Sequence, residues 1–212
     1  MTDDQPSNPE PAVSDTTADT DADVSETAAA ESGGSAVVIL DVLPNGRPDD
    51  TRPNYQKSPI AYGLGVDAFG LYELMLREET DVSVSDRRSV DDDDITRYRE
   101  VDFDDLTRNA VAEIEYAVEA IVEADERRFV DFFNEAEPIS LRLHQLNLLP
   151  GIGKKLRNNV LDERKRGPFE TFAELSDRVS GLHRPQEVIV DRIIEEIRDT
   201  ELKYRAFVGR ER

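Results

Sequence analysis

The sequence contains no cysteine, and its longest purely aliphatic run is Ala36–Leu40. Without cysteine the chain can form no disulfide, no cysteine-ligated zinc site and no thiol nucleophile, which favours an intracellular protein. A membrane-spanning helix needs about 20 apolar residues, and residues 1–33 lack the basic and apolar regions of a signal peptide. We therefore expect a cytoplasmic protein with no membrane partner.

Basic residues are scarce: 26 Lys and Arg stand against 47 Asp and Glu among 212 residues, for a net charge of -21. Residues 1–33 contain nine acids and no base, and residues 34–137 contain 26 acids and 11 bases. Residues 138–212 reverse the balance, with 12 acids and 15 bases. Because phosphate binding requires local positive potential, a polyanionic partner is expected only for the last third of the chain.

Lysine is rarer than arginine, at five residues against 21, and the acids are dispersed over all segments. This composition resembles that of proteins from extreme halophiles, in which carboxylates keep surfaces hydrated in concentrated salt. On that interpretation the acidity reflects the solvent and not the partner. For residues 1–33 alone, an acidic interaction tail is an equally simple interpretation.

The pattern divides the chain into a tail and structured regions. Residues 1–34 combine Asp, Ser, Thr, Pro and Ala with only two Val, so they cannot bury enough apolar surface to offset the entropy of ordering and should form a disordered acidic tail. The remaining roughly 180 residues suffice for one large domain or two small ones. Because β-rich segments are followed by helical ones, the predicted fold class is α+β multidomain.

Residues 35–102 are expected to form a small β-barrel. Residues 60–66 alternate with period two, and turn sequences such as Pro44-Asn45-Gly46 separate short β-rich segments. Gly63, Gly65 and Gly70 stand where such a barrel needs sharp strand bends or bulges. The predicted strands are Ala36–Val42, Ile60–Val66, Phe69–Leu76, Val82–Val84 and Ile95–Val101.

Residues 103–137 are expected to form a helical connector. Phe129, Phe132 and Phe133 lie at i, i+3 and i+4, which predicts a short second helix that Pro138 ends. Their spacing favours burial in the core over base stacking. The preceding helix carries one apolar stripe, made of Leu106, Ala110, Ile114, Ala117, Val118 and Ile121.

The most informative segment is Leu149-Pro150-Gly151-Ile152-Gly153, which resembles the core pattern of the helix-hairpin-helix family. We expect residues 138–200 to hold a tandem helix-hairpin-helix domain. Ser140 is the predicted N-cap of a first helix that contains Leu143 and Leu146.

The physical basis of the motif can be stated without the family. Pro150 and Gly151 break the first helix, Ile152 anchors the turn in the core, and Gly153 opens the second helix. The unpaired N–H groups and the dipole at that helix start suit a phosphodiester, and the next two lysines add positive charge. The candidate nucleic-acid-binding residues are Pro150, Gly151, Ile152, Gly153, Lys154, Lys155 and Arg157.

The helix-hairpin-helix resemblance implies contact with the nucleic-acid backbone without sequence reading. It implies no cofactor apart from a monovalent cation held by loop carbonyls in many members. Arg157 replaces a small Ala common in the family, which bears on how closely the helices cross and offers another phosphate contact. The alternative is a tight structural connection or a protein-binding surface, but Lys154, Lys155 and the local basic surplus favour phosphate.

A degenerate second hairpin follows. Arg166–Phe172 resembles the link between paired hairpins, and Val179–His183 stands at the second loop but lacks its second Gly. This loop is expected to complete a four-helix core, with His183 and Arg184 solvated. Residues 201–212 form a C-terminal extension.

The order of barrel, connector and hairpin pair resembles an archaeal family numbered 655 among the domains of unknown function and described as nucleotide- or RNA-binding. The resemblance covers about residues 36–200 and implies an OB-like (oligonucleotide-binding-type) barrel at the front. The segments that match it best are Arg128–Asn134, Leu141–Leu146 and Gly167–Phe172.

We therefore expect a non-catalytic nucleic-acid-binding protein, with RNA favoured over DNA because the resembled family is described in that way. In the barrel, Tyr55, Tyr62, Phe69 and Tyr72 are candidates for a base-stacking platform. Half-burial is the simpler expectation for each of these rings.

No enzyme is expected. A helix-hairpin-helix glycosylase needs Gly-Pro-Asp after the hairpin, where this chain has Gly167-Pro168-Phe169. A metal-dependent nuclease could use Asp91–Asp94 with Asp102 and Asp104 as Mg²⁺ ligands, although consecutive acids usually form a solvated run. A further alternative is an interaction adaptor whose hairpins bind another protein.

Overall fold

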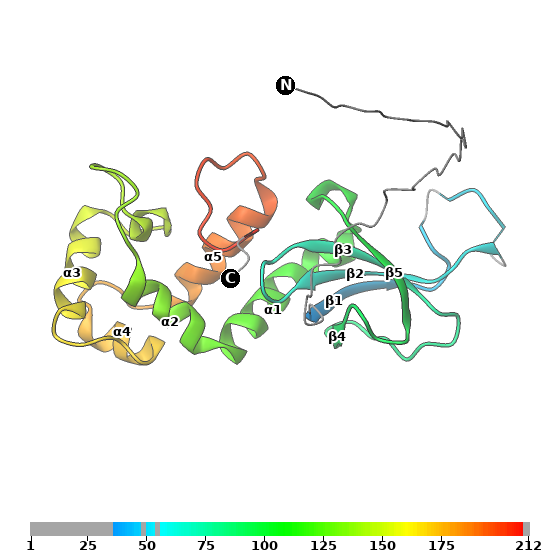
Figure 1. Ribbon diagram of the computed structural model, residues 1–212, viewed down its shortest axis with the longest axis horizontal. Coiled ribbons are helices and arrows are strands. Elements are labelled where there is room, and N and C mark those ends of the chain that lie inside the picture. Colours follow the sequence, from blue (N-terminus) through cyan, green and yellow to red (C-terminus); the bar gives the residue numbers. More distant parts are fainter. Residues whose placement is uncertain (1–35, 48–49, 54–55, 210–212) are drawn as a thin grey trace, which may run out of the picture. The chain divides into compact units, whose positions relative to one another are not determined.

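The computed structural model describes residues 36–47, 50–53 and 56–209. It confirms the α+β class, with an antiparallel sheet followed by helices (Figure 1). The predicted tail, residues 1–34, and the stacking candidate Tyr55 lie outside the described residues. No helix in the described ranges combines the length and the apolarity needed to cross a membrane.

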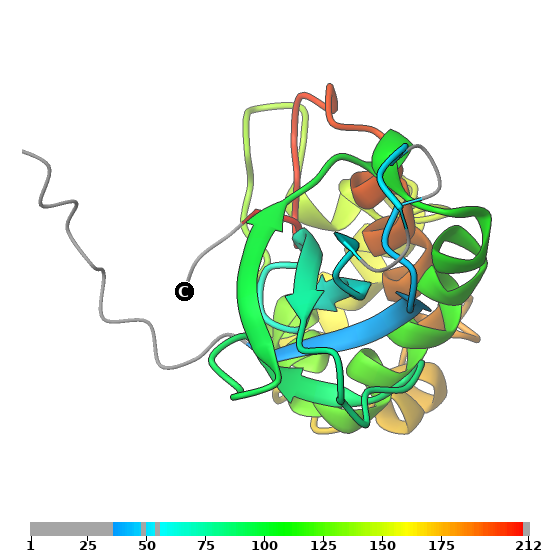
Figure 2. The same ribbon diagram turned by 90° about the vertical axis from the view of Figure 1, so that its right-hand side faces the viewer.

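Five strands form one antiparallel sheet in the order β4-β1-β2-β3-β5. Leu40 is an extra residue in the first strand, because Ile39 pairs with Gly63 whereas Asp41 pairs with Tyr62. Such a bulge bends a strand, and the sheet curls into a half-barrel (Figure 2). The strands are β1 Ala36–Leu43, β2 Ile60–Gly65, β3 Leu71–Leu76, β4 Arg87–Ser89 and β5 Ile95–Glu100.

Two of the three glycines predicted at strand bends, Gly65 and Gly70, lie against an aromatic ring. A Cβ atom at Gly65 would lie 3.1 Å from the Tyr72 ring, and one at Gly70 would lie 3.0 Å from its hydroxyl. These two glycines therefore make room for one aromatic side chain, while the bulge at Leu40 supplies the bend in β1.

The fourth strand is not where the sequence predicts it. Val82–Val84 lie in an irregular segment, and β4 consists of polar residues that pair with Ala36–Val38 of β1. Val82 is buried whereas Val84 is exposed, so this apolar run covers the sheet with one side chain only. The prediction was wrong because it relied on apolar content, whereas an edge strand is defined by its backbone pairing and tolerates charged side chains.

In the part of the chain that the structure describes, seven helical segments follow the sheet. The first long helix, α1, starts on the sheet because the Thr107 hydroxyl accepts the Ala110 N–H at 3.0 Å and donates to the Asp41 carboxylate of β1. The segments are the 3-10 helices η2 Phe103–Asp105 and η3 Gln145–Leu148 and the α-helices α1 Arg108–Ala124, α2 Glu126–Glu135, α3 Lys154–Arg164, α4 Phe172–Arg178 and α5 Pro185–Arg198.

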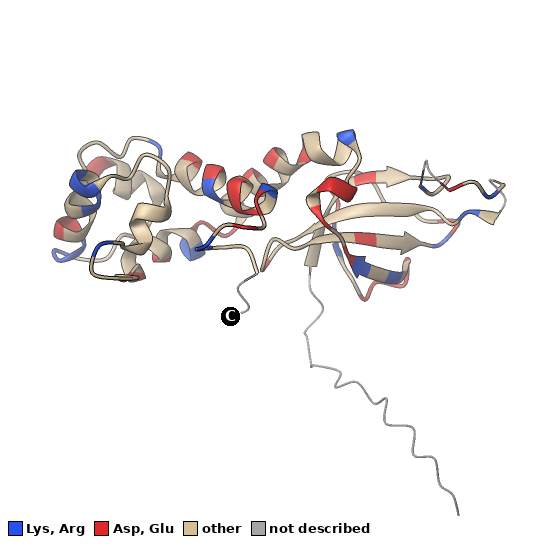
Figure 3. Cartoon of the chain, turned by 90° about the horizontal axis from the view of Figure 1, so that it is seen from above, with Lys and Arg blue, Asp and Glu red and all other residues tan. Residues whose placement is uncertain are grey.

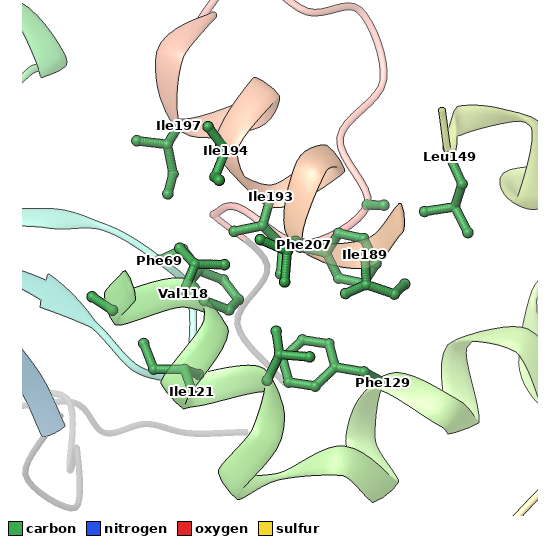
Figure 4. Close-up of a cluster of buried hydrophobic side chains, with 14 of the residues drawn as sticks. Phe69, Val118, Ile121, Phe129, Leu149, Ile189, Ile193, Ile194, Ile197 and Phe207 are labelled. Atoms are coloured by element: carbon green, nitrogen blue, oxygen red, sulfur yellow. The ribbon is translucent and has the colours of Figure 1, made fainter. Parts of the chain in front are cut away.

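One hydrophobic core extends from one face of the sheet through α1, α2 and α5 (Figure 4). Phe129 and Phe133 are fully buried, and the Phe132 ring packs 4.9 Å from the Phe207 ring. The predicted core role of the phenylalanine cluster is therefore confirmed. A smaller apolar cluster that includes Leu74 fills the other face of the sheet.

The predicted helix beginning at Ser140 is wrong. Residues 138–144 form a tight loop closed by a β-bridge between Pro138 and His144, and Leu141 at its tip is fully exposed. The Ser140 hydroxyl accepts the N–H groups of Arg142 at 3.3 Å and Leu143 at 3.1 Å. A serine turn and a helix N-cap use the same kind of side-chain-to-backbone bond, so the residue type does not distinguish them.

The C-terminal segment returns to the sheet. The carboxylate of Glu196, which is completely buried, accepts the backbone N–H groups of Ala206, Phe207 and Val208 at 2.6–3.0 Å. The Gly209 N–H then donates to the Ala68 carbonyl, between β2 and β3, at 2.9 Å. Within its described part, the predicted extension 201–212 is thus packed against both α5 and the sheet.

Candidate nucleic-acid interface

The loop between η3 and α3, residues 149–153, forms a turn fixed by a proline and a glycine. The Ile152 N–H donates to the Leu149 carbonyl at 3.2 Å, and both side chains are buried. Gly151 has a φ of +76°, which suits the third position of a type II turn, while Pro150 occupies the second. The predicted burial of Ile152 is therefore observed, and the turn separates the 3-10 helix η3 from α3.

Gly153 is the N-cap of α3, with an extended backbone (φ -78°, ψ 179°) that any residue can adopt. A Cβ atom added at either Gly151 or Gly153 would meet no atom within 4 Å. The protein interior therefore gives no packing reason for a glycine at position 153. The missing side chains leave a bare backbone surface that faces outward.

The first turn of α3 presents free donors. Among the described residues, no acceptor is bonded to the backbone N–H groups of Lys154, Lys155 and Leu156, and no side chain caps the helix. Both lysine side chains are exposed and form no ion pair with any described residue. Donors, helix dipole and two positive charges thus gather at one place.

Arg157 lies one turn after Gly153 and stabilises the loop through Asn147. Its Nη1 donates to the Asn147 side-chain oxygen at 3.1 Å, and Asn147 Nδ2 donates to the Ile152 carbonyl at 2.9 Å. Its Nε and Nη2 contact Asn158 Oδ1 at 3.2 and 3.0 Å. The structure therefore gives Arg157 a positioning role, and its contact with phosphate stays a prediction.

The remaining bases near α3 have other partners. Arg164 Nη1 donates to the carbonyls of Phe133, Asn134 and Ala136 at 2.7–3.2 Å, which satisfies the end of α2. Lys165 and Arg166 pair with carboxylates of the same helix. Along α3 the bases Lys154, Lys155 and Arg157 come first, and the acids Asp162 and Glu163 come next, before Arg164 (Figure 3). The bases without an ion-pair partner among the described residues are therefore concentrated at the start of the helix.

The second loop, between α4 and α5, repeats the geometry of the first. The Leu182 N–H donates to the Val179 carbonyl at 3.0 Å, both side chains are buried, and Gly181 has a φ of +97°. His183 occupies the place of Gly153 and is exposed. This loop lacks the second glycine, and His183 carries an exposed side chain at the position where the first loop has none.

A hollow beside the first loop is lined by the loop residues together with Arg192 and Glu195 of α5. The carbonyls of Leu149 and Gly151 each accept one backbone N–H within the loop. A carbonyl oxygen has two lone pairs, so each of these oxygens keeps one that a cation can use. A monovalent cation at these oxygens stays a prediction.

The family model described as "Protein of unknown function (DUF655)" matches residues 34–209. The chain belongs to the DUF655 family. It is 37% identical over 176 residues to the uncharacterized protein MJ0038 of Methanocaldococcus jannaschii, covering 80% of this chain and 77% of that protein. It is also similar to the crystal structure of Af1531 from Archaeoglobus fulgidus, with a TM-score of 0.76, 39% identity and coverage of 82% of this chain and 99% of that one.

The described part of this DUF655 chain does not assemble the other sequence candidates. Tyr62 and Phe69 are buried, and Tyr72 packs edge-on against Tyr98 with ring centroids 6.0 Å apart. Within the described ranges, no three His, Asp or Glu residues are grouped so that they could hold a metal ion. Asp91–Asp94, Asp102 and Asp104 therefore do not converge on one site.

Sequence reasoning missed two side-chain amides that build the DUF655 loop region. Asn147 joins the first loop to α3, and Asn159 Nδ2 donates to the Ser180 carbonyl of the second loop at 3.0 Å. The only signal in the sequence was a polar residue inside the apolar run Leu146–Leu149. Side-chain hydrogen bonds are most often made to backbone or water.

Proposed function

We propose that this chain is a non-catalytic nucleic-acid-binding protein that contacts the phosphate backbone at the start of α3. The observation that carries the proposal is the bare loop. Neither Gly151 nor Gly153 has a neighbour where a Cβ would lie. Directly after Gly153, the described structure has three backbone N–H groups and two lysine side chains without a partner among the described residues. Contacts of this kind hold a phosphate without reading the base sequence.

The two loops support a tandem helix-hairpin-helix assignment. Each has a glycine with positive φ, the same backbone hydrogen bond and a buried apolar residue on either side. Each also leads into a helix, α3 or α5. The repeat of one geometry at two places supports a duplicated binding module, in which the first loop is bare and the second carries the exposed side chain of His183.

The sheet supports an OB-like assignment. β4 pairs with β1 and β5 pairs with β3, so the two edge strands are consecutive in sequence. A five-stranded, partly open Greek-key barrel has this kind of arrangement, and such barrels bind oligonucleotides. RNA is favoured over DNA on the resemblance stated above, and a protein-binding adaptor is the second candidate.

The test is a fluorescence-anisotropy titration of the full chain with single-stranded RNA and with duplex DNA, in buffers of increasing KCl. The double variant Lys154→Gln/Lys155→Gln should weaken binding and lower the salt slope, by roughly 0.7 for each single-strand phosphate that the protein no longer neutralises. The matched control is Lys165→Gln/Arg166→Gln, which removes the same charge from the other end of α3, where both residues are ion-paired.

The two variants separate a local site from general charge. The proposal expects the control to retain most of the affinity. Equal loss in both variants would indicate nonspecific attraction to α3. No binding of the unmodified chain to either nucleic acid, at any salt concentration, would refute the proposal and leave the adaptor as the better candidate.

A further inference from the structure

A hollow of about 640 Å³ lies on the sheet, and its lining includes no residue of the loops 149–153 and 179–183. It is lined by four arginines and two carboxylates, Arg47, Arg52, Arg97, Arg99, Asp50 and Glu73. The volume is within the range of small-molecule sites. The surrounding segment, residues 34–137, has more than twice as many acids as bases, so a hollow with an excess of arginine is contrary to the trend of the chain.

The register of the sheet brings these side chains together. Arg99 pairs with Glu73, and Arg97 pairs with Met75 on the same face, because residues two apart along a strand point to one side. Arg47 reaches the same carboxylate from the segment after β1, with Nε and Nη2 both 2.6 Å from the oxygens of Glu73. Arg99 Nε contacts Glu73 at 3.1 Å.

Glu73 holds two guanidinium groups in fixed positions. Burial by itself would raise the pKa of Glu73, but the hydrogen bonds from Arg47 and Arg99 outweigh it and hold that pKa below its ordinary value. The carboxylate is therefore charged at neutral pH. Glu73 thereby holds the Arg99 guanidinium on the same face of β5 as Arg97, and guanidinium groups held in this way suit an external anion such as a phosphate.

The other two arginines differ in their pairing. Arg52 is engaged by Asp50 at 2.7 Å. Arg97 is exposed and forms no ion pair with any residue that the structure describes. Among the described residues that line the hollow, four arginines and two carboxylates give a formal charge of about +2 at neutral pH.

The floor of the hollow is apolar. Ile60 is buried, and Met75 is 39% exposed, which places it among the large apolar side chains that the described structure leaves open to solvent. Toward β1 the same face is closed, since Asp41 of β1 accepts the Thr107 hydroxyl at the start of α1. A ligand here would meet guanidinium groups around an apolar patch.

We propose that this arginine-lined hollow is a second ligand site, which takes a nucleoside phosphate. The phosphate lies against Arg97 and Arg99, and the base or sugar lies against Met75. Two sources share this chemistry: a free mononucleotide, and a nucleotide unit within an RNA strand. The site does not use the loop at α3, so binding of a mononucleotide does not depend on the function proposed above, whereas binding of an RNA strand would deepen it.

The starting protein is the full chain carrying Lys154→Gln/Lys155→Gln, in which nucleic-acid binding at the α3 loop is weakened. It is compared with the same double variant carrying Arg97→Gln in addition. Isothermal titration calorimetry with AMP, inorganic phosphate and a short oligoadenylate measures each affinity. We expect Arg97→Gln to weaken AMP or oligoadenylate binding by roughly tenfold or more. The matched control is Arg87→Gln on β4, which removes the same charge from the opposite edge of the sheet.

The probes distinguish the two sources. AMP binding that Arg97→Gln weakens supports a mononucleotide site, whereas oligoadenylate binding with no AMP binding supports an RNA strand. Inorganic phosphate that binds as tightly as AMP would overturn the role of Met75 and with it the nucleoside assignment. If Arg97→Gln and Arg87→Gln behave alike with every probe, or if no probe binds, the proposal is overturned, and the result for the α3 loop is unaffected.

Discussion

Arg192 and Glu196 form a buried ion pair one turn apart on α5, with Nε 2.7 Å from Oε1. Arg192 also donates to the Tyr204 carbonyl at 2.6 Å, and Glu196 accepts three backbone N–H groups from residues 206–208. The pair therefore serves both as a salt bridge and as the attachment point of the C-terminal segment.

Neutralising Glu196 should destabilise the protein strongly. Glu196→Gln removes the buried counter-charge of Arg192, which leaves only the half-exposed Glu195 beside it. It also replaces one of the two acceptor oxygens of the C-terminal segment by an NH2 donor. Breaking a buried pair from one side costs about 3–5 kcal/mol. Urea unfolding measures this loss. Glu195→Gln is the control, because that carboxylate also contacts Arg192 but is 51% exposed, and it should change the free energy of unfolding by less than about 1 kcal/mol. Similar losses in both variants would contradict the role assigned to the buried carboxylate.

The two loop glycines should respond differently to alanine. Gly151→Ala forces a Cβ residue to adopt a φ of +76°, which should cost about 1–2 kcal/mol of stability. Gly153→Ala has an ordinary backbone and open space, so its melting temperature should stay close to that of the unmodified protein. Both should weaken nucleic-acid binding, because each methyl group projects where the backbone is bare. A Gly153→Ala protein that melts normally and binds with full affinity would show that the loop does not approach the ligand.

Stability should fall below about pH 6.5 because of His144. Burial, together with the charges of Arg157 and Arg164, lowers the pKa of His144 from its ordinary value of 6.5, and Nδ1 accepts the Leu146 N–H at 3.2 Å. The unfolded chain then takes up the proton first, so stability is retained above pH 6.5 and is lost as the pH falls toward the lower pKa of the folded state.

Proton NMR of the imidazole C–H signals tests this expectation. The chain has two histidines, and a His183→Gln variant identifies the signal of His144. A His144 signal that titrates at or above pH 6.5 in the folded protein would contradict the assigned cause.

Asn134 should be needed for the join between α2 and the segment before α4. Its Nδ2 donates to the Phe169 carbonyl at 2.9 Å, and its Oδ1 accepts the Phe169 N–H at 2.8 Å. Asn134→Ala takes both of these bonds from the backbone of a buried residue, at a cost of about 1–3 kcal/mol. Thermal unfolding should show this loss, whereas Asn109→Ala, at an exposed position of α1, should have little effect. An unchanged melting temperature for Asn134→Ala would mean that water replaces both bonds.

Local patterns were sufficient for much of the fold. The period-two run at Ile60–Gly65 and the helical stripe of α1 correspond to observed elements. In α1 the burial of one face leaves a direct periodic signal. In β2 all six residues are buried, and the alternation is between large side chains and Ala or Gly. The loop at Gly151 was also predictable, since proline and glycine specify this turn. The segment 138–144 was not, because a serine turn and a helix start have the same local bonding, and only the bridge from Pro138 to His144 decides between them.

Other features depend on contacts between residues far apart in sequence. The number of basic residues around α3 does not show that Arg164 donates to the free carbonyls at the end of α2, roughly 30 residues earlier in the chain. The arginine hollow is equally hidden, because Arg47 and Arg99 meet only through the register of β3 and β5. Tertiary pairing of this kind leaves no periodic trace.

The amide of Asn159 joins the second loop to α3, the helix that begins at the first loop. Both loops are therefore attached to the same helix, so the distance between them is not set by a flexible linker. If one strand engages both, the second contact forms as an intramolecular step at a high effective concentration. Cutting the Asn159 bond would then lower avidity while leaving each individual loop contact chemically unchanged.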